Sequence, residues 1–455
     1  MTRRCGLAER GAAAGRGARR LFSVGLVGVV VAAALLAALV PGLVPGSPAG
    51  RDAVPAAAAV VFAASYLALA IGKVPFLAID RAGVALVGAC LMVVSGALPL
   101  EDAYKAVDLD TITLLLGMMI VVANLRLSGF FALANAWVMR RAHHPLVLLA
   151  AVTLTSGVFS AFLVNDAICL VLTPLVLELT LALKRRPVPY LLAVAMASNV
   201  GSTATITGNP QNIMIGSFSR IPYAGFAGAL APVAAAGLVL TVLLIALAHR
   251  GEFAAGRFDP PVLRVRANRV LMWRALAATA VMVALFFAGQ PPAKAAIIIG
   301  GLLLLTRRVR SERVYDEIDW SLLLMFAGLF IIVAGAQHAL LTPQLVARVG
   351  ALHLDRVPVL SAVTAVLSNI VSNVPAVLVL KPFIAPLHDQ TRAWLTVAMS
   401  STLAGNFTVL GSIANLIVVQ RAAAGGVAIG FWTYFVVGAP LTLLTLAVGT
   451  VWLAL

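Results

Sequence analysis

The polar side chains with the clearest chemical meaning in this sequence stand together in SNVGSTATITGNPQNIMIG, residues 198–216. Asparagine amides donate and accept hydrogen bonds at fixed positions, and serine and threonine hydroxyls do so with more rotational freedom. The stretch interrupts a segment in which about twenty apolar residues are expected of a plain membrane-spanning helix. An unsatisfied polar group at membrane depth is costly, so we expect these side chains to line a cavity and bind a ligand there.

Pro210 and the glycines around it predict a break in the helix near residues 207–212, because proline removes a backbone donor and glycine loosens the turn. A broken helix offers half-helix N termini, whose unpaired N–H groups and partial positive charge suit the oxygens of an anion. It also offers half-helix C termini and unwound carbonyls, which suit a cation. The alternative is a polar contact between two helices, in which serine and threonine only serve packing.

The polar stretch occurs twice. VAMASNVGSTATITGNPQNIMI (194–215) aligns without gaps with VAMSSTLAGNFTVLGSIANLIV (397–418) at an offset of 203 residues. Two further pairs of blocks match in the same order: FLVNDAICLVLTPLVL (162–177) with NIVSNVPAVLVLKPFI (370–385), and DLDTITLLLGMMIVV (108–122) with EIDWSLLLMFAGLFI (317–331). Three blocks repeated in one order indicate an internal duplication.

The composition is that of an integral membrane protein. Of the 455 residues, 62% are hydrophobic and 11% are charged, and the mean hydropathy is +1.03. The net charge of +16 comes from short basic clusters between apolar spans, as in cytoplasmic loops, and not from one face of a nucleic-acid-binding module. The sequence has no metal-type cysteine spacing, Walker-type phosphate loop, HExxH motif or paired catalytic carboxylates. We therefore expect no enzyme activity, no cofactor and no nucleic-acid partner.

The basic clusters predict an all-α polytopic fold of about eleven transmembrane helices and two re-entrant hairpins, with the N terminus in the cytoplasm and the C terminus outside. The expected parts are a basic cytoplasmic tail (1–20), N-terminal scaffold helices (21–100, with a first span at 22–44), a first repeat (101–250), a basic cytoplasmic loop and helix pair (251–313) and a second repeat (314–455). Each repeat contains one hairpin, at 145–183 and 358–387, and one broken helix, at 190–217 and 393–419.

The same topology predicts which turns face outward. The acidic loop at 101–108, the turn after residue 217 and the Gln290-Pro291-Pro292 turn are external, whereas the arginine-rich loop 249–274 is cytoplasmic. An odd number of spans separates the first helices of the two repeats, so the repeats are inverted. An inverted pair places its binding site near the membrane midplane, between the repeats.

The two hairpin tips LVNDA (163–167) and VSNVPA (371–376), with TGNPQN (207–212) and GSIAN (411–415), resemble those of the ion transporter superfamily. Within it the chain is similar to anion permeases of the divalent-anion/sodium symporter type, to the arsenical-pump membrane protein and to the citrate-transporter-like domain. The resemblance covers residues 55–455 and implies an elevator transporter with eleven spans and two hairpins, usually a homodimer, in the cell (cytoplasmic) membrane.

The candidate site residues follow from these motifs. The resemblance implies that the hairpin tips and broken helices hold the substrate and the coupling cation through Asn165, Asn373, Gly208, Asn209, Asn212, Gly411 and Asn415. The polar stretch, its repeat and the tips add Asp166, Ser198, Asn199, Thr207, Ser372 and Ser412. The sodium-coupled carboxylate transporters have Ser-Asn-Thr at both tips. Here the first tip is Val164-Asn165-Asp166, which looks more like the arsenical-pump branch. A sodium site near Asn165 and Asn373 and a coupling proton both stay open.

Asp166 is the carboxylate expected at membrane depth, which makes it a candidate proton carrier or cation ligand. The alternative is a carboxylate that caps the second arm of its own hairpin. The matching position in the second repeat is Val374, so the fold does not require a carboxylate there.

Three functions are compatible with these residues. The first is secondary active transport of a small anion or oxyanion (arsenite-like, inorganic or carboxylate), coupled to a proton or sodium gradient. The second is cation/proton antiport on the same scaffold, and the third is a polytopic membrane enzyme.

Overall fold

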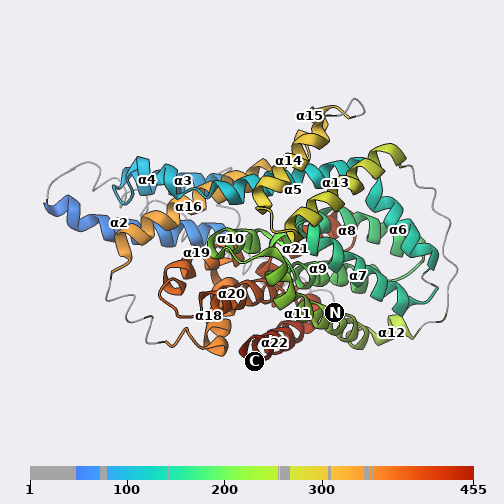
Figure 1. The fold of residues 1–455 in the computed structure, drawn as a ribbon. Helices are drawn as coiled ribbons and strands as arrows, with labels where there is room; N and C mark the ends of the chain where they lie inside the picture. The colour runs from blue at the N-terminus through green and yellow to red at the C-terminus, as the bar shows by residue number, and fades with distance from the viewer. Residues whose placement is uncertain are drawn as a thin grey trace, which may run out of the picture. The chain divides into compact units, whose positions relative to one another are not determined.

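The protein is helical wherever its structure is described. The computed structural model describes residues 48–71, 79–141, 143–254, 256, 267–305, 309–342, 349 and 352–455, and these ranges contain helices, turns and no strand (Figure 1). The all-α prediction is therefore confirmed for this part of the chain. The predicted tail (1–20) and first span (22–44) lie outside the described residues.

The described helices follow the predicted order closely. They are α2 (Pro48–Ile71), α3 (Arg81–Val94), α4 (Leu100–Ala106), α5 (Leu109–Leu127), α6 (Phe130–Arg141), α7 (Pro145–Leu163), α8 (Asn165–Ala182), α9 (Pro187–Ser202), η1 (Ile206–Gly208), α10 (Pro210–Ser219), α11 (Tyr223–Ala248), α12 (Arg250–Phe253), α13 (Arg269–Phe287), α14 (Pro292–Leu304), α15 (Ser311–Tyr315), α16 (Trp320–Leu340), α18 (Val357–Val371), α19 (Asn373–Ile384), α20 (Gln390–Ala404), η2 (Val409–Gly411), α21 (Ile413–Ala424) and α22 (Phe431–Ala454).

Many of these helices suit a bilayer by length and composition. Seven of the described helices are long and apolar enough to cross a membrane, and six shorter ones are also apolar. The chain is therefore a multi-pass membrane protein. The count of eleven spans and the division into repeats stay predictions.

The chain divides into two compact units. Unit 1 (residues 1–108 and 320–345) contains α2, α3, α4 and α16, and α3 and α16 run side by side (Figure 1). A Cβ atom built on Gly328 of α16 would lie 2.6 Å from the Ala85 carbonyl carbon of α3. Glycine at this position thus lets the two backbones touch, which is how membrane helices gain packing energy.

Unit 2 (residues 109–319 and 346–455) contains the other described helices, including both predicted hairpins. Its α5 packs on α14 in the way that α16 packs on α3, since a Cβ atom on Gly117 would lie 2.5 Å from the Ala296 carbonyl carbon. An ion pair between Arg126 and Glu317 adds a polar contact within unit 2. Helices α5 and α16 open the two copies of the duplication, so each copy begins with a helix that uses glycine for close packing.

Each hairpin turns at a single residue. Val164 joins α7 to α8 with φ 63°, and Ser372 joins α18 to α19 with φ 77°. Positive φ is sterically disfavoured for residues other than glycine, and most of all for a β-branched valine. Such strained positions persist only where the surroundings hold them, typically at functional sites. In both hairpins the next residue is the tip asparagine, Asn165 or Asn373, which begins the second arm.

The first broken helix is interrupted earlier than the sequence predicts. Helix α9 ends at Ser202 and α10 begins at Pro210, with the short η1 turn between them, so the break spans 203–209 rather than 207–212. The difference has a local cause: Pro210 starts a helix instead of ending one, because a first-turn residue needs no backbone donor. Asn209 caps α10 by accepting a hydrogen bond from the Asn212 backbone N–H at 2.9 Å.

The predicted cytoplasmic loop 249–274 is also shorter than expected, since Arg269 and Arg274 belong to α13. Asn268 sets this boundary because its side chain accepts a hydrogen bond from the Leu271 backbone N–H at 3.2 Å. Arginine favours helices almost as strongly as alanine, so charge alone does not keep such residues in a loop.

The close crossing of α7 and α9 gives a direct test of the packing. A Cβ atom on Gly201 would lie 2.1 Å from the Gly157 carbonyl oxygen, and a backbone atom cannot move aside as a side chain can. We expect Gly201→Ala to lower the free energy of unfolding by about 1–3 kcal/mol through overpacking. Thermal unfolding in detergent measures the change. The matched control is Gly228→Ala on α11, where a Cβ atom meets nothing within 4 Å. Equal melting temperatures for the two variants would contradict the crossing.

Candidate functional site

Asn199, on α9, is the hub of a buried hydrogen-bond network that joins the two copies of the polar stretch. Its Oδ1 accepts from Asn165 Nδ2 at 3.0 Å and from Ser412 Oγ at 3.1 Å. Its Nδ2 donates to Asn406 Oδ1 at 2.8 Å and to Asn415 Oδ1 at 3.0 Å. One side chain thereby connects the tip of the first hairpin to both sides of the break in the second broken helix.

Thr402 of α20 has the equivalent place in the second copy, 203 residues after Asn199. Its Oγ1 accepts from Asn209 Nδ2 at 3.1 Å and from Gln211 Nε2 at 3.1 Å, and it donates to Asn212 Oδ1 at 3.5 Å. These contacts repeat those of Asn199 with Ser412 and Asn415, with the two broken helices exchanged. Each broken helix therefore binds the break of the other.

Asn212 and Asn415 hold the breaks open in the same way. Asn212 Nδ2 donates to the carbonyls of Ser202 and Thr205 at 3.1 and 3.0 Å. Asn415 Nδ2 donates to the carbonyls at the two equivalent positions, residues 405 and 408, at 2.8 and 3.2 Å. A helix that stops inside the membrane leaves such carbonyls without partners, so these amides replace the missing backbone donors.

The second hairpin tip meets the same helices. The Asn373 amide nitrogen donates to Ser368 Oγ at 2.6 Å and to the carbonyls of Ser401 and Gly411 at 3.1 and 3.2 Å. A Cβ atom on Gly411 would lie 2.8 Å from the Gly405 carbonyl oxygen, so a larger residue would displace this turn. Ser372 supplies the strained tip that precedes Asn373.

Gly208 and Thr207 form the equivalent turn in the first broken helix. A Cβ atom on Gly208 would lie 2.1 Å from the Ser202 carbonyl oxygen, which excludes any other residue. The Thr207 hydroxyl contacts the Tyr223 hydroxyl at 2.8 Å, at the start of α11. The turn is thus fixed on one side by its own backbone and on the other by a buried tyrosine.

Asp166 and Ser198 lie beside the network without joining it through any of the contacts above. Asp166 is half-buried in the first turn of α8, where a carboxylate also complements the helix dipole. Its backbone N–H donates to Asn165 Oδ1 at 2.9 Å. Ser198 is buried and donates to the Ala195 carbonyl at 2.8 Å, and its hydroxyl is 2.9 Å from Cys169 Sγ.

Several residues of the network do not appear among those predicted from the sequence. They are Ser202, Gln211, Ser368, Ser401, Thr402 and Asn406. The duplication carried a signal for three of them, because Ser401 aligns with Ser198, Thr402 aligns with Asn199 and Asn406 aligns with Thr203. Residues that differ between the copies are easily passed over when only identities are compared. Lys381 of α19 places its ammonium 3.8 Å from the centroid of the Phe218 ring on α10.

The network is neutral and tightly closed. All its amides and hydroxyls come from uncharged residues, and Glu252 is the only charged residue classed as buried in the described part of the chain. No group of three or more metal-ligating side chains occurs within the described ranges. Amide–amide bonds can be exchanged for bonds to a ligand that both donates and accepts, so the arrangement suits a small hydroxylated or oxygen-rich solute.

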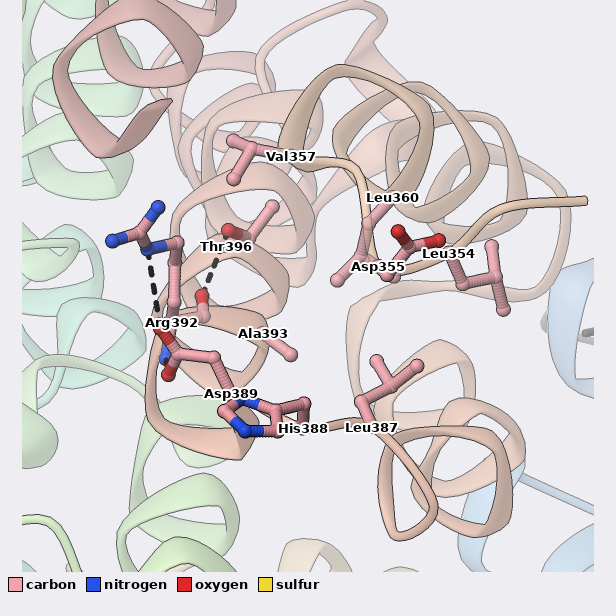
Figure 2. Close-up of a pocket in the computed structure, with 10 residues that line it drawn as sticks. All are labelled: Leu354, Asp355, Val357, Leu360, Leu387, His388, Asp389, Arg392, Ala393 and Thr396. Carbon is pink, nitrogen blue, oxygen red and sulfur yellow. Dashed lines mark hydrogen bonds and ion pairs between the residues drawn. The ribbon is translucent and has the colours of Figure 1, made fainter. Parts of the chain in front are cut away.

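A small pocket at the base of the second hairpin is separate from this network. Figure 2 shows its walls, formed by the start of α18, the turn that follows α19 and the start of α20 around a cavity of about 130 Å³. Asp355, Asp389 and Arg392 give it charge, and Arg392 Nε lies 3.3 Å from Asp389 Oδ2. None of the predicted site residues lines it.

Comparison with known proteins finds a family and several relatives. A family model described as "Citrate transporter" matches residues 66–404. The chain is 29% identical to the silicon efflux transporter LSI3 of Oryza sativa subsp. japonica, over 86% of this chain and 96% of the relative. It is 31% identical to the inner membrane protein YbiR of Escherichia coli K12, over 77% and 89%. It is 23% identical to the putative transporter arsB of Dictyostelium discoideum, over 82% and 87%.

A solved structure shares the fold. The YdaH transporter of Alcanivorax borkumensis superposes with a TM-score of 0.54 at 16% identity, over 88% of this chain and 97% of that one.

Because Asn199 has several hydrogen-bond partners, we expect its substitution to cost more folding stability than the substitution of an asparagine with one partner. Asn199→Ala leaves Asn165 Nδ2 and Asn415 Oδ1 without a partner and removes one of the bonds to Asn406, and each buried unsatisfied group costs about 1–3 kcal/mol. The matched control is Asn135→Ala, which breaks a single bond of 3.2 Å to the Leu175 carbonyl. We expect Asn199→Ala to melt at the lower temperature in detergent. Equal melting temperatures would argue against the hub.

Proposed function

We propose a substrate class for this chain, which belongs to the citrate transporter family and is a multi-pass membrane transporter. In our proposal it carries a small oxyanion across the cytoplasmic membrane by secondary active transport. The driving force is a proton or sodium gradient, and the motion is of the elevator type. A homodimer with a cytoplasmic N terminus remains our expectation for the assembly.

Four helix N termini at the polar network carry this proposal. Helices α8, α10, α19 and α21 begin at Asn165, Pro210, Asn373 and Ile413, and each start lies at or beside a predicted site residue. A helix N terminus carries about half a positive elementary charge and unpaired N–H donors. Four such termini favour a negatively charged group without any basic side chain in the network.

The relatives support an oxygen-rich substrate. The name of the rice relative gives silicon as its cargo. Silicon dissolves in neutral water as silicic acid, an uncharged molecule whose hydroxyl groups donate and accept hydrogen bonds and which becomes an oxyanion only when it loses a proton. Hydroxyl groups and oxyanion oxygens pair well with asparagine amides, which both donate and accept. A carboxylate group would accept hydrogen bonds from the same amide N–H donors, but it has no hydrogen to donate to the amide oxygens.

Transport by purified protein in liposomes tests the proposal. We expect wild-type protein to accumulate one member of a panel of arsenite, silicic acid, phosphate, sulfate and citrate under an imposed proton or sodium gradient. Asn165→Ala and Asn373→Ala should lower the apparent affinity for that solute up to about a hundredfold, since a buried amide bond contributes about 1–3 kcal/mol. Proton-coupled movement of a metal cation with no solute uptake would instead support the cation/proton antiporter.

Asp166 is our candidate for coupling. It lies in the first turn of the second arm of the first hairpin, whereas the second hairpin has Val374 at the matching place. Because only one of the two copies carries a carboxylate at this place, the shared fold does not require it. A role in the transport cycle explains its presence better than a role in holding the hairpin. We infer that Asp166 releases or accepts a proton as the site alternates between the two faces.

The variant Asp166→Asn separates coupling from helix capping. The amide keeps the shape and an acceptor oxygen but cannot exchange a proton. We expect the variant to exchange labelled solute across the membrane and to lose accumulation driven by a pH gradient. Uptake against a gradient at the wild-type level, across a series of pH values, would show that Asp166 only caps its helix.

A further inference from the structure

A cavity of about 560 Å³ beside the first broken helix points to a second anion site. We propose that this cavity is an external vestibule in which Arg220 and Lys294 concentrate a small anion before it reaches the turn at Thr207. The inference rests on the proposed function, because a vestibule serves a transporter. Its charge and its access can nevertheless be measured without transport.

The walls of the cavity come from three parts of unit 2 that are far apart in sequence. Asp110 and Leu114 come from α5. Residues from η1 to the start of α11 and residues from the end of α13 to the start of α14 supply the rest of the lining. The basic clusters of the sequence predict that the turn after residue 217 and the Gln290 turn face outward, and both line this cavity, as a common opening on that face requires.

The charges of the lining favour an anion. Arg220 and Lys294 are both exposed, and Asp110 is the one carboxylate in the lining. Within the described residues none of the three forms an ion pair with another side chain. Two cations against one carboxylate leave a net positive cavity with cationic groups available to a ligand. Charged clefts of this kind raise the local concentration of a solute of opposite charge.

Helix stability does not explain Lys294. It lies in the first turn of α14, two residues after Pro292, and the partial positive charge of a helix N terminus repels a cation there. Arg220 is held by the backbone instead: it ends α10 in the left-handed region, with φ 54°, and its N–H donates to the Gly216 carbonyl at 3.2 Å.

Tyr223 connects the cavity to the buried network. It lines the cavity, only 3% of its surface is exposed, and its hydroxyl lies 2.8 Å from Thr207 Oγ1. Phe286 and Phe287 pack on it with ring centroids at 5.2 and 5.1 Å. One aromatic side chain thus separates an anion in the vestibule from the Thr207–Gly208 turn. We assign Tyr223 as a positioning residue that holds this turn from the cavity side.

Charged thiol reagents test the vestibule directly. Ser217→Cys and, as a second probe, Gln290→Cys place a thiol in the lining, in a background that carries Cys5→Ser and Cys90→Ser and keeps the buried Cys169. The purified full-length protein is treated at low ionic strength with anionic sulfonatoethyl methanethiosulfonate or with cationic trimethylammonioethyl methanethiosulfonate. Each rate is divided by the rate with free 2-mercaptoethanol.

We expect both probes to react faster with the anionic reagent. One unit charge about 6 Å away changes the preference between the two reagents by roughly tenfold in water. Arg220→Gln and Lys294→Gln should each lower the preference by about that factor or less, and Asp110→Asn should raise it. High salt should remove most of the difference, because it screens exposed charges.

A matched control lies on α4. Tyr104 is 69% exposed beside Glu101 and Asp102, and Lys105 pairs with Asp102, so the local charge stays negative and a thiol in Tyr104→Cys should prefer the cationic reagent. Three results would overturn the proposal: no reaction at either probe, no preference for the anionic reagent, or no response to the three charge substitutions. Reaction confined to membrane-permeant neutral reagents would show a lipid-filled gap instead of an aqueous vestibule.

Transport measurements then separate this inference from the function on which it rests. If the protein moves no anion in liposomes, the proposed function fails while the labelling result stands. If it does, the Arg220→Gln/Lys294→Gln double variant should raise KM at low salt with little change in kcat. A double variant with unchanged KM would show that the vestibule does not serve transport.

Discussion

The structure depends on how two interrupted helices satisfy their backbone carbonyls inside the membrane. Asn212 and Asn415 donate to the carbonyls freed at the two breaks, over distances of 2.8–3.2 Å. Without such donors a break at this depth would leave carbonyls unpaired, at a high cost in a medium without water. The polar residues of both breaks therefore have a structural reason to be there, and the site that we propose for a solute would be built from the same groups.

Because each broken helix binds the break of the other, the two copies of the duplication depend on each other. Asn199 reaches Asn415 in the second copy, and Thr402 reaches Asn212 in the first. A ligand that replaces some of these amide bonds changes contacts in both copies at once. Such mutual dependence gives a physical basis for a site that opens toward one face or the other as a unit.

Fully charged side chains and neutral hydrogen-bonding groups lie in different places. The buried network is neutral and uses helix N termini and amides, which stabilise an anion without a buried basic side chain whose removal from water would be costly. The cationic groups Arg220 and Lys294 line an open cavity instead, where water still solvates them. An anion would thus be attracted by full charges and bound by partial ones, which favours release on the far side.

The helical class, the membrane setting and the family could be predicted from the sequence, because apolar spans, basic clusters and a duplicated polar motif are local or periodic signals. Both hairpin tips could be predicted as well, and the first break to within a few residues, since Pro210 can end a helix or begin one. That Asn406 and Thr402 join the network and that Lys381 packs on Phe218 is visible only in the packed helices. The partners of Asn199 in the second copy lie more than 200 residues away in the sequence. Which side chains meet therefore depends on how the helices cross, and neighbouring residues in the sequence carry no signal for it.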